Sequence, residues 1–129
     1  MKKVRFEAEL IEGHKGVTVV LVPFDPDEKW VGKPIRLHGR RHGWLVTGKV
    51  NGIHFDGYIG ERWNRFFIIV DRDLREAARI AVGDNVEVEV EPTASARAFA
   101  HAWEQSKVTT QPKTARADAI ISPKSGRQK

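Results

Sequence analysis

The sequence contains no cysteine, so disulfide bonds, thiolate metal ligands and a cysteine nucleophile are all excluded. Its serines all lie after residue 94, which leaves no serine nucleophile in the longer preceding segment. Long apolar runs are also missing: those at 17–23 and 66–70 are far shorter than the roughly 20 residues of a membrane helix. The basic start has no apolar stretch behind it, so we expect no signal peptide, no membrane association and a cytoplasmic location.

What remains is a composition of 40% hydrophobic and 30% charged residues, which is typical of one soluble globular domain of 129 residues. The net charge of +5 is unevenly distributed. Up to residue 92, 15 Lys and Arg residues balance 15 Asp and Glu residues, whereas residues 93–129 hold seven basic residues against two acidic ones. We therefore divide the chain into a neutral domain at 1–92 and a basic C-terminal tail at 93–129. Such a tail is usually solvated and mobile, and otherwise binds nucleic acid or another anionic surface.

Short apolar or alternating segments separated by turn signals dominate the first 91 residues. We expect strands at 4–12, 17–22, 34–37, 45–50, 53–59, 66–70 and 85–91. Asn51-Gly52 predicts a type I′ hairpin, because both residues tolerate the positive φ of that turn. Two short helices are expected at 24–31 and 71–80. The pattern predicts a mainly β protein, a small closed or split β-barrel of about six to seven strands with two short helices and a C-terminal helix.

Aspartates precede both of the short helices. Asp25 and either Asp71 or Asp73 are expected to cap them, and Asp27 lies in the first turn of the earlier helix. An alternative is that the pairs Asp25/Asp27 and Asp71/Asp73 each serve as a general acid and a general base. Capping accounts for their positions without any catalytic role.

The tail predicts one further helix, at about 94–106. In it Ala96, Phe99, Ala100 and Trp103 fall at positions i, i+3, i+4 and i+7, which forms an apolar stripe. We expect this stripe to dock on the barrel or on a partner, which includes a second copy of the chain. A short helix at 114–121 and disorder from residue 122 complete the expectation.

Several segments follow one another in an order known from a protein family. They are FEAELIEG (6–13), VPFD (22–25), WVGK (30–33), GKVNGIHFDG (48–57) and VGDNVEVEV (82–90). Together they resemble the domain-of-unknown-function family nineteen-oh-five, a group of small bacterial and archaeal barrel proteins, over about residues 4–91. The resemblance implies a β-barrel with no assigned activity, and it supplies no catalytic residues. Some members carry a C-terminal segment associated with bacteriocin protection, and residues 103–107 with 113–116 look like an eroded version of it.

The sequence departs from the family pattern at two places. Extra residues are found within 36–44, and 60–65 replaces a glycine-rich link. Both places are rich in arginine and tryptophan, which gives a set of candidate ligand-binding residues: Arg40, Arg41, Trp44, Arg62, Trp63 and Arg65. Guanidinium groups pair with phosphate or carboxylate, and indole rings stack on bases or cations. If the two places meet, they would hold nucleic acid or a phosphorylated small molecule. The alternative is that the tryptophans pack at the rim and the arginines are solvated or paired with Asp56 and Glu61.

The histidines do not form a metal-binding pattern. His38 and His42 are four residues apart, a spacing that suits one metal ion only on a helix, and the glycines beside them disfavour a helix. His14, His54 and His101 stand alone, and we expect them to be surface or hydrogen-bonded residues. No cofactor fingerprint is present.

Function therefore divides into three hypotheses. The favoured one is a non-enzymatic module that binds an anionic ligand at the arginine and tryptophan residues. The alternative is a structural or protein-interaction domain that uses Phe99 and Trp103, in bacteriocin or stress protection. The third is a hydrolase, which would require a pocket with a buried carboxylate or histidine of shifted pKa.

Overall fold

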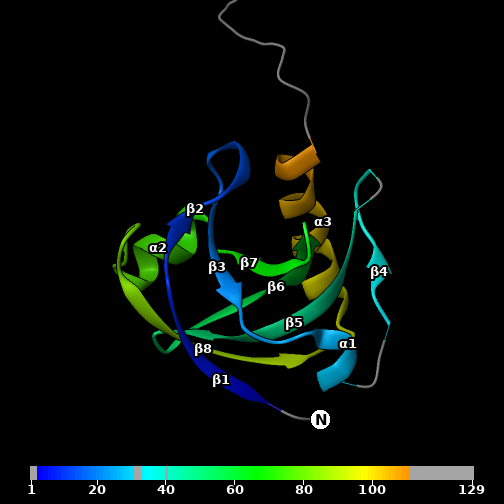
Figure 1. The fold of residues 1–129 in the computed structure, drawn as a ribbon, viewed down its shortest axis with the longest axis horizontal. Helices are drawn as coiled ribbons and strands as arrows, with labels where there is room; N and C mark the ends of the chain where they lie inside the picture. Colours follow the sequence, from blue (N-terminus) through cyan, green and yellow to red (C-terminus); the bar gives the residue numbers. More distant parts are fainter. Residues whose placement is uncertain (1–2, 31–32, 40, 111–129) are drawn as a thin grey trace, which may run out of the picture.

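The computed structural model describes residues 3–30, 33–39 and 41–110, in which one antiparallel sheet curls into a nearly closed barrel with three α-helices (Figure 1). The strands are β1 (Val4–Glu9), β2 (Ile11–Glu12), β3 (Thr18–Val22), β4 (Ile35–Arg36), β5 (His42–Val50), β6 (Ile53–Arg62), β7 (Arg65–Ile69) and β8 (Asn85–Pro92). The helices are α1 (Pro26–Lys29), α2 (Arg72–Ala78) and α3 (Ala96–Thr110). The mainly β barrel that the sequence predicts is confirmed.

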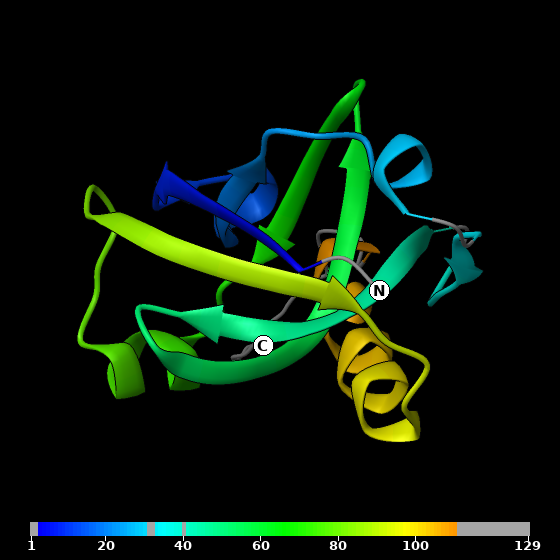
Figure 2. The ribbon, with the colours of Figure 1, turned by 90° about the horizontal axis from the view of Figure 1, so that it is seen from below.

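A bend in the first strand closes the barrel. Around the sheet the strands follow the order β1-β8-β5-β6-β7-β3-β2, and β4 is added to the start of β5. Before the bend the chain pairs with β8, and after it the chain pairs with β3. Leu10 forms the bend: its amide donates to the Asp84 carbonyl and its carbonyl accepts from the Gly83 amide, each at 2.8 Å. The two edges of the sheet therefore lie on one continuous segment (Figure 2), which leaves little unpaired edge.

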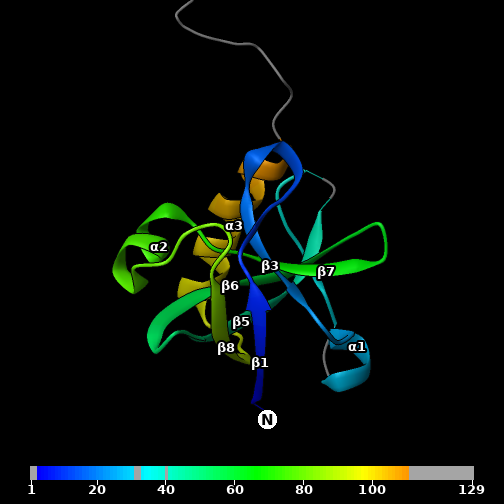
Figure 3. The same ribbon diagram turned by 60° about the vertical axis from the view of Figure 1, so that its left-hand side comes forward.

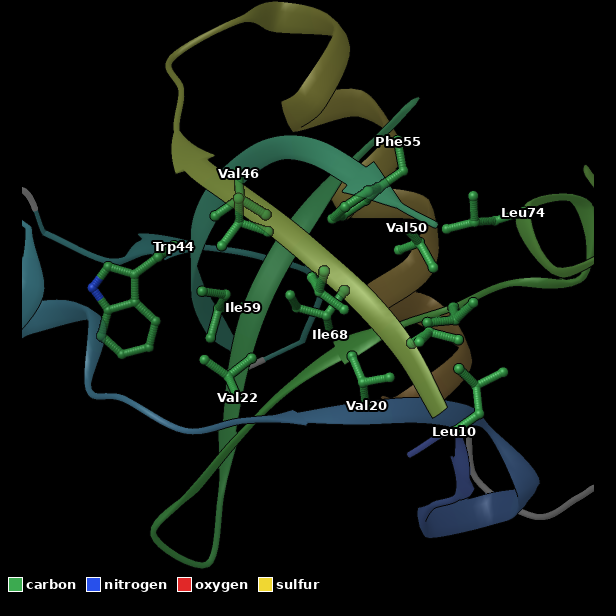
Figure 4. Close-up of a cluster of buried hydrophobic side chains, with 14 of the residues drawn as sticks. Leu10, Val20, Val22, Trp44, Val46, Val50, Phe55, Ile59, Ile68 and Leu74 are labelled. Atoms are coloured by element: carbon green, nitrogen blue, oxygen red, sulfur yellow. The ribbon is translucent and has the colours of Figure 1, made fainter. Parts of the chain in front are cut away.

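The barrel interior is filled mainly by aliphatic side chains that alternate along the strands, together with aromatic ones such as Trp44 and Phe55 (Figure 4). Val86, Val88 and Val90 of β8 are fully buried, as the alternation with glutamate predicts. The strand β3 is buried along nearly its whole length, as its β-branched run predicts. Burying each such side chain stabilises the fold by roughly 1.5–3 kcal/mol.

The local turn and cap signals form as predicted. Asn51 and Gly52 adopt φ of 47° and 84° at the β5–β6 turn. The Asp25 carboxylate caps α1 by accepting from the amide two residues later, with Pro26 in the first turn. The Asp71 carboxylate caps α2 by accepting from the amide three residues later. The two short helices lie at opposite ends of the barrel (Figure 3).

The helix α3 covers part of the outer face of the sheet, over β5 and β6 (Figures 1 and 2). Beneath and beside it lies a second apolar cluster outside the barrel: Val19, Leu37, Tyr58, Phe67, Ile69 and Ala102. The helix was expected at about 94–106, and it begins and ends a few residues later than that. No helix within the described ranges is long and apolar enough to cross a bilayer.

The face by which α3 docks is not the predicted stripe as a whole. Ala98, Ala102 and Ser106 are fully buried, whereas Phe99 is 41% exposed and Trp103 is half-buried. The expected stripe therefore makes only part of this contact: Trp103 packs edge-on against His38 of the β4–β5 loop, whereas Ala96, Phe99 and Ala100 are exposed. The sheet itself supplies the large side chains of this cluster, so the helix approaches closely through small residues spaced four apart. The expected helix at 114–121 and the expected disorder from residue 122 lie outside the described residues.

Candidate functional site

Four of the sequence-predicted site residues line one pocket, which has a volume of about 180 Å³. Arg41 comes from the β4–β5 loop, and Arg62, Trp63 and Arg65 come from the β6–β7 hairpin. We call this hollow the arginine pocket. It lies on the outside of the barrel, between these two segments and the β2–β3 connection that includes Gly13 and Val17 (that connection lies at the top of Figure 3).

The floor of the arginine pocket is hydrocarbon. It is formed by side chains from β2, β3, β7 and the loop before β3: Ile11, Val17, Val19, Leu21 and Phe67. The position of the Phe67 ring depends on Gly60 in the neighbouring strand, since a Cβ atom there would lie 2.5 Å from the ring. A glycine at 60 therefore allows the aromatic ring to pack directly against the backbone of β6 and form part of the pocket floor.

The rim is formed by a tight hairpin whose turn residues are unusual. Arg62 and Arg65 face each other across the strands, and Trp63 and Asn64 form the turn with φ of 52° and 63°. Asparagine tolerates a positive φ, but a tryptophan in this region is uncommon. The Trp63 side chain is 79% exposed, and the Arg62 guanidinium lies over it at 4.6 Å from the ring centroid.

Arg41 enters the pocket from a well-anchored loop. Its carbonyl accepts from the amide of Leu37 at 2.8 Å, and Leu37 is buried. The same loop is tied to the last turns of α3, because the His38 amide donates to the Ser106 hydroxyl at 3.1 Å. The docking of α3 therefore helps to position one wall of the arginine pocket.

Burial is the main cause that lowers the pKa of Arg41. The nearby Tyr58 hydroxyl raises that pKa, and the positive charge of Arg62 lowers it. Among the described residues no carboxylate lines the pocket. The arrangement brings three guanidinium groups to one hollow, which favours an anion there.

Of the other predicted site residues, the structure describes Trp44, Phe99 and Trp103, which do not line this pocket. Arg40 lies outside the described residues. Trp44 is buried in the barrel core, and its indole Nε1 donates to the Asp27 carboxylate at 2.9 Å. It lines a separate hollow of about 590 Å³ that Phe99 also lines. Phe99 and Trp103 lie side by side on α3, with 6.1 Å between their ring centroids.

Sequence reasoning missed one polar cluster, which joins α3 to the barrel. The Asp71 carboxylate accepts from Gln105 Nε2 at 3.1 Å and lies 3.2 Å from His101 Nε2. The other nitrogen of His101 faces the Asp56 carbonyl. Both neighbours of His101 only accept, so both hydrogen bonds form together only when the ring carries two protons. The spacing of His101 and Gln105, four residues apart on one helix, was the available signal that they share a face.

This cluster lines a hollow of about 470 Å³, and its two titratable groups, Asp71 and His101, are hydrogen-bonded within the fold. The hydrogen bond from His101 is the main cause that lowers the pKa of Asp71 from 3.8 to about 2, with burial opposing it. The same bond raises the pKa of His101. Asp71 accepts from three donors, the α2 cap included, so it is a poor general base. Within the part of the chain that the structure describes, no three metal-ligating side chains come together.

Comparison with known proteins places the chain in a family. No similar protein was found among curated proteins. The family model described as "Domain of unknown function (DUF1905)" matches residues 6–90, which are the barrel strands from β1 to β8 together with α1 and α2. This match covers most of the chain and agrees with the resemblance found in the sequence. The chain therefore belongs to the DUF1905 family.

Proposed function

We propose that this domain is a cytoplasmic, non-enzymatic module that binds a small anionic ligand in the arginine pocket. The observation that carries the proposal is the convergence of Arg41, Arg62, Arg65 and Trp63 on one apolar hollow. Guanidinium groups bind carboxylate or phosphate through charge-assisted hydrogen bonds. Arg41 and Arg62 are partly removed from water, which makes their pairing with an anion stronger than at a fully solvated site.

The energetics of the β6–β7 hairpin support this proposal. Like charges directly across two strands destabilise a sheet, and Arg62 and Arg65 occupy such positions. A tryptophan at positive φ costs about 1 kcal/mol or more. An exposed indole contributes little to folding. A binding role explains why these unfavourable features occur together at one hollow.

The composition of the pocket favours binding over catalysis. Among its described lining residues there is no histidine, carboxylate, serine or threonine that could serve as base or nucleophile. In the cluster around Asp71, the two titratable side chains, Asp71 and His101, are each hydrogen-bonded within the fold, so neither is a free base. We therefore propose no reaction for this domain.

Isothermal titration calorimetry at low salt tests the proposal. Phenyl phosphate, adenosine monophosphate and a short single-stranded oligonucleotide are titrated separately into the full chain. We expect saturable binding of at least one of these anions. The double variant Arg62→Ala/Arg65→Ala should weaken it at least about tenfold, since charge-assisted hydrogen bonds contribute about 1.5–3 kcal/mol each. Arg72→Ala, on α2 and paired with Glu76, is the matched control. The proposal fails if none of the three anions binds.

A second candidate function is protein interaction through α3. It is favoured by the exposure of Phe99, which lies beside the half-buried Trp103 on α3. A second copy of the chain is the simplest partner. Sedimentation equilibrium of the wild-type protein and of Phe99→Ala tests it. A monomer in both forms would count against self-association through this surface.

A further inference from the structure

The polar and apolar parts of the arginine pocket are sharply separated. The floor side chains, Ile11, Val17, Val19, Leu21 and Phe67, contain only carbon and hydrogen. The charged groups lie at the rim, on Arg41 and on the two arginines of the β6–β7 hairpin. A ligand that fills this hollow has to match the same division, with an apolar end inward and an anionic end at the rim.

We infer, as an extension of the proposed function, that the ligand is an amphiphilic anion with a purely hydrocarbon body of about one aromatic ring. Its head is one carboxylate or phosphate group. An aryl or short branched acyl acid belongs to this class. Nucleotides and nucleic acids do not, although their charge suits the arginines.

The size of the hollow supports this class of ligand. Its volume of about 180 Å³ is below the roughly 300–1,000 Å³ of pockets that hold drug-sized molecules. It is close to the roughly 150 Å³ of apolar cavities that take up benzene. One ring therefore fits the floor, and a nucleoside with its sugar does not.

The chemistry of the floor excludes a nucleobase more strongly than the size does. The edges of a base carry amide-like donors and acceptors that have to be hydrogen-bonded when they leave water. The floor offers no side-chain partner for them among the described residues. A phenyl ring has no such groups, so its transfer into the hollow is favourable. The indole of Trp63 at the rim can stack on either kind of ring, and therefore does not discriminate between them.

The head group is recognised by charge and geometry at the rim. Arg41 is half-buried, and this burial lowers the pKa of its guanidinium. A guanidinium in that setting gains more from an anion than a solvated one does. The guanidiniums of Arg62 and Arg65 come from positions directly opposite each other in the β6–β7 hairpin, and the charge of Arg62 is close enough to act on Arg41.

The experiment compares ligands that share a phosphate head. Phenyl phosphate, inorganic phosphate and adenosine monophosphate are titrated calorimetrically into the full chain. We expect phenyl phosphate to bind at least about tenfold more tightly than either of the others, the ratio that burial of about two methylene-sized groups produces. Equal or tighter binding of adenosine monophosphate, or of inorganic phosphate, would overturn the inference and leave the proposed function standing. Absence of binding by all three would overturn the proposed function itself.

A variant of the floor gives a second, independent readout. Val17→Thr keeps the size of the side chain and places a hydroxyl in the apolar floor. We expect this substitution to lower the affinity for phenyl phosphate several-fold, while the affinity for inorganic phosphate stays unchanged. Val82→Thr, at an exposed position that does not line the pocket, is the matched control. A loss of the same size for both ligands would contradict a hydrocarbon-binding floor.

Discussion

Replacing Asp71 by asparagine should loosen the attachment of α3 to the barrel. The side chain lies where two roles meet: it caps α2 and it accepts from His101 and Gln105 on α3. Asparagine caps a helix about as well as aspartate, so Asp71→Asn keeps the first role. It removes the negative charge beside His101, and so isolates the contribution of that charge.

The size of the loss follows from the pKa of Asp71. A fall from 3.8 to about 2 corresponds to at most about 2.5 kcal/mol of stabilisation. The carboxylate is 32% exposed, so solvent screening reduces this figure. We expect Asp71→Asn to lower the free energy of unfolding by about 1–1.5 kcal/mol at pH 5.

The stabilisation that this cluster contributes is lost at both low and high pH, for two different reasons. The lowered pKa of Asp71 means that its contribution is complete above about pH 4 and is lost as the pH falls toward 2. The pKa of His101 is raised from 6.5, chiefly by Asp71. Its contribution is therefore complete below 6.5 and is lost as the pH rises through the higher value in the folded state. The wild-type protein should be most strongly stabilised by this cluster between about pH 4 and 6.5.

Urea denaturation followed by circular dichroism between pH 3 and 9 measures these effects. In Asp71→Asn the decline in stability on the alkaline side should largely disappear, because the main cause of the raised pKa is gone. Asp73→Asn is the matched control, since it lies in the first turn of the same helix and lines the same hollow. If Asp71→Asn has the stability and the pH profile of the wild-type protein, the cluster does not attach α3 as described.

Three further substitutions test the fold and the hairpin. Gly48→Ala should lower the free energy of unfolding, measured by urea denaturation, by about 2–4 kcal/mol, because the new Cβ would lie 1.8 Å from the Glu89 carbonyl oxygen on β8. A free energy of unfolding equal to that of the wild-type protein would contradict that close approach. Gly60→Ala should displace the Phe67 ring, and so lower the free energy of unfolding by about 1–3 kcal/mol and weaken the binding of phenyl phosphate. An unchanged affinity for phenyl phosphate would show that the ring is not part of the pocket floor. Trp63→Asn should change the free energy of unfolding by less than about 0.5 kcal/mol, because asparagine tolerates the positive φ but loses the contact with the Arg62 guanidinium. Ligand affinity should fall, and an unchanged affinity would refute a binding role for Trp63.

Much of the barrel is predictable because its signals are local. The Asn51-Gly52 turn, the alternation in β8 and the cap of α1 each depend on neighbouring residues in the chain. The β6–β7 turn is different. Trp63 carries no turn signal, and the hairpin forms because β6 and β7 pair along their length within the barrel. Tertiary pairing overrides local preference there.

The features that require distant contacts could not be predicted. The attachment of His101 to Asp71 joins residues 30 positions apart, and no periodic pattern encodes it. The docking face of α3 depends on how much space the sheet leaves, which is set by Tyr58 and Phe67 on other strands. The grouping of arginine with tryptophan was visible in the sequence. That Trp44 faces the core is decided by the register of β5, and that Trp63 lies at the pocket follows from its place in the β6–β7 turn.

The central claim, that a small amphiphilic anion binds in the arginine pocket, is tested most directly by the indole signals of the tryptophans. A ¹⁵N–¹H correlation spectrum of the full chain contains one indole N–H signal for each of its four tryptophans. On addition of phenyl phosphate, we predict a saturable shift of the Trp63 signal, assigned with Trp63→Phe, while the signal of the buried Trp44 stays in place. A shift of the Trp44 or Trp103 signal with Trp63 unmoved, or no shift at all, would contradict the account.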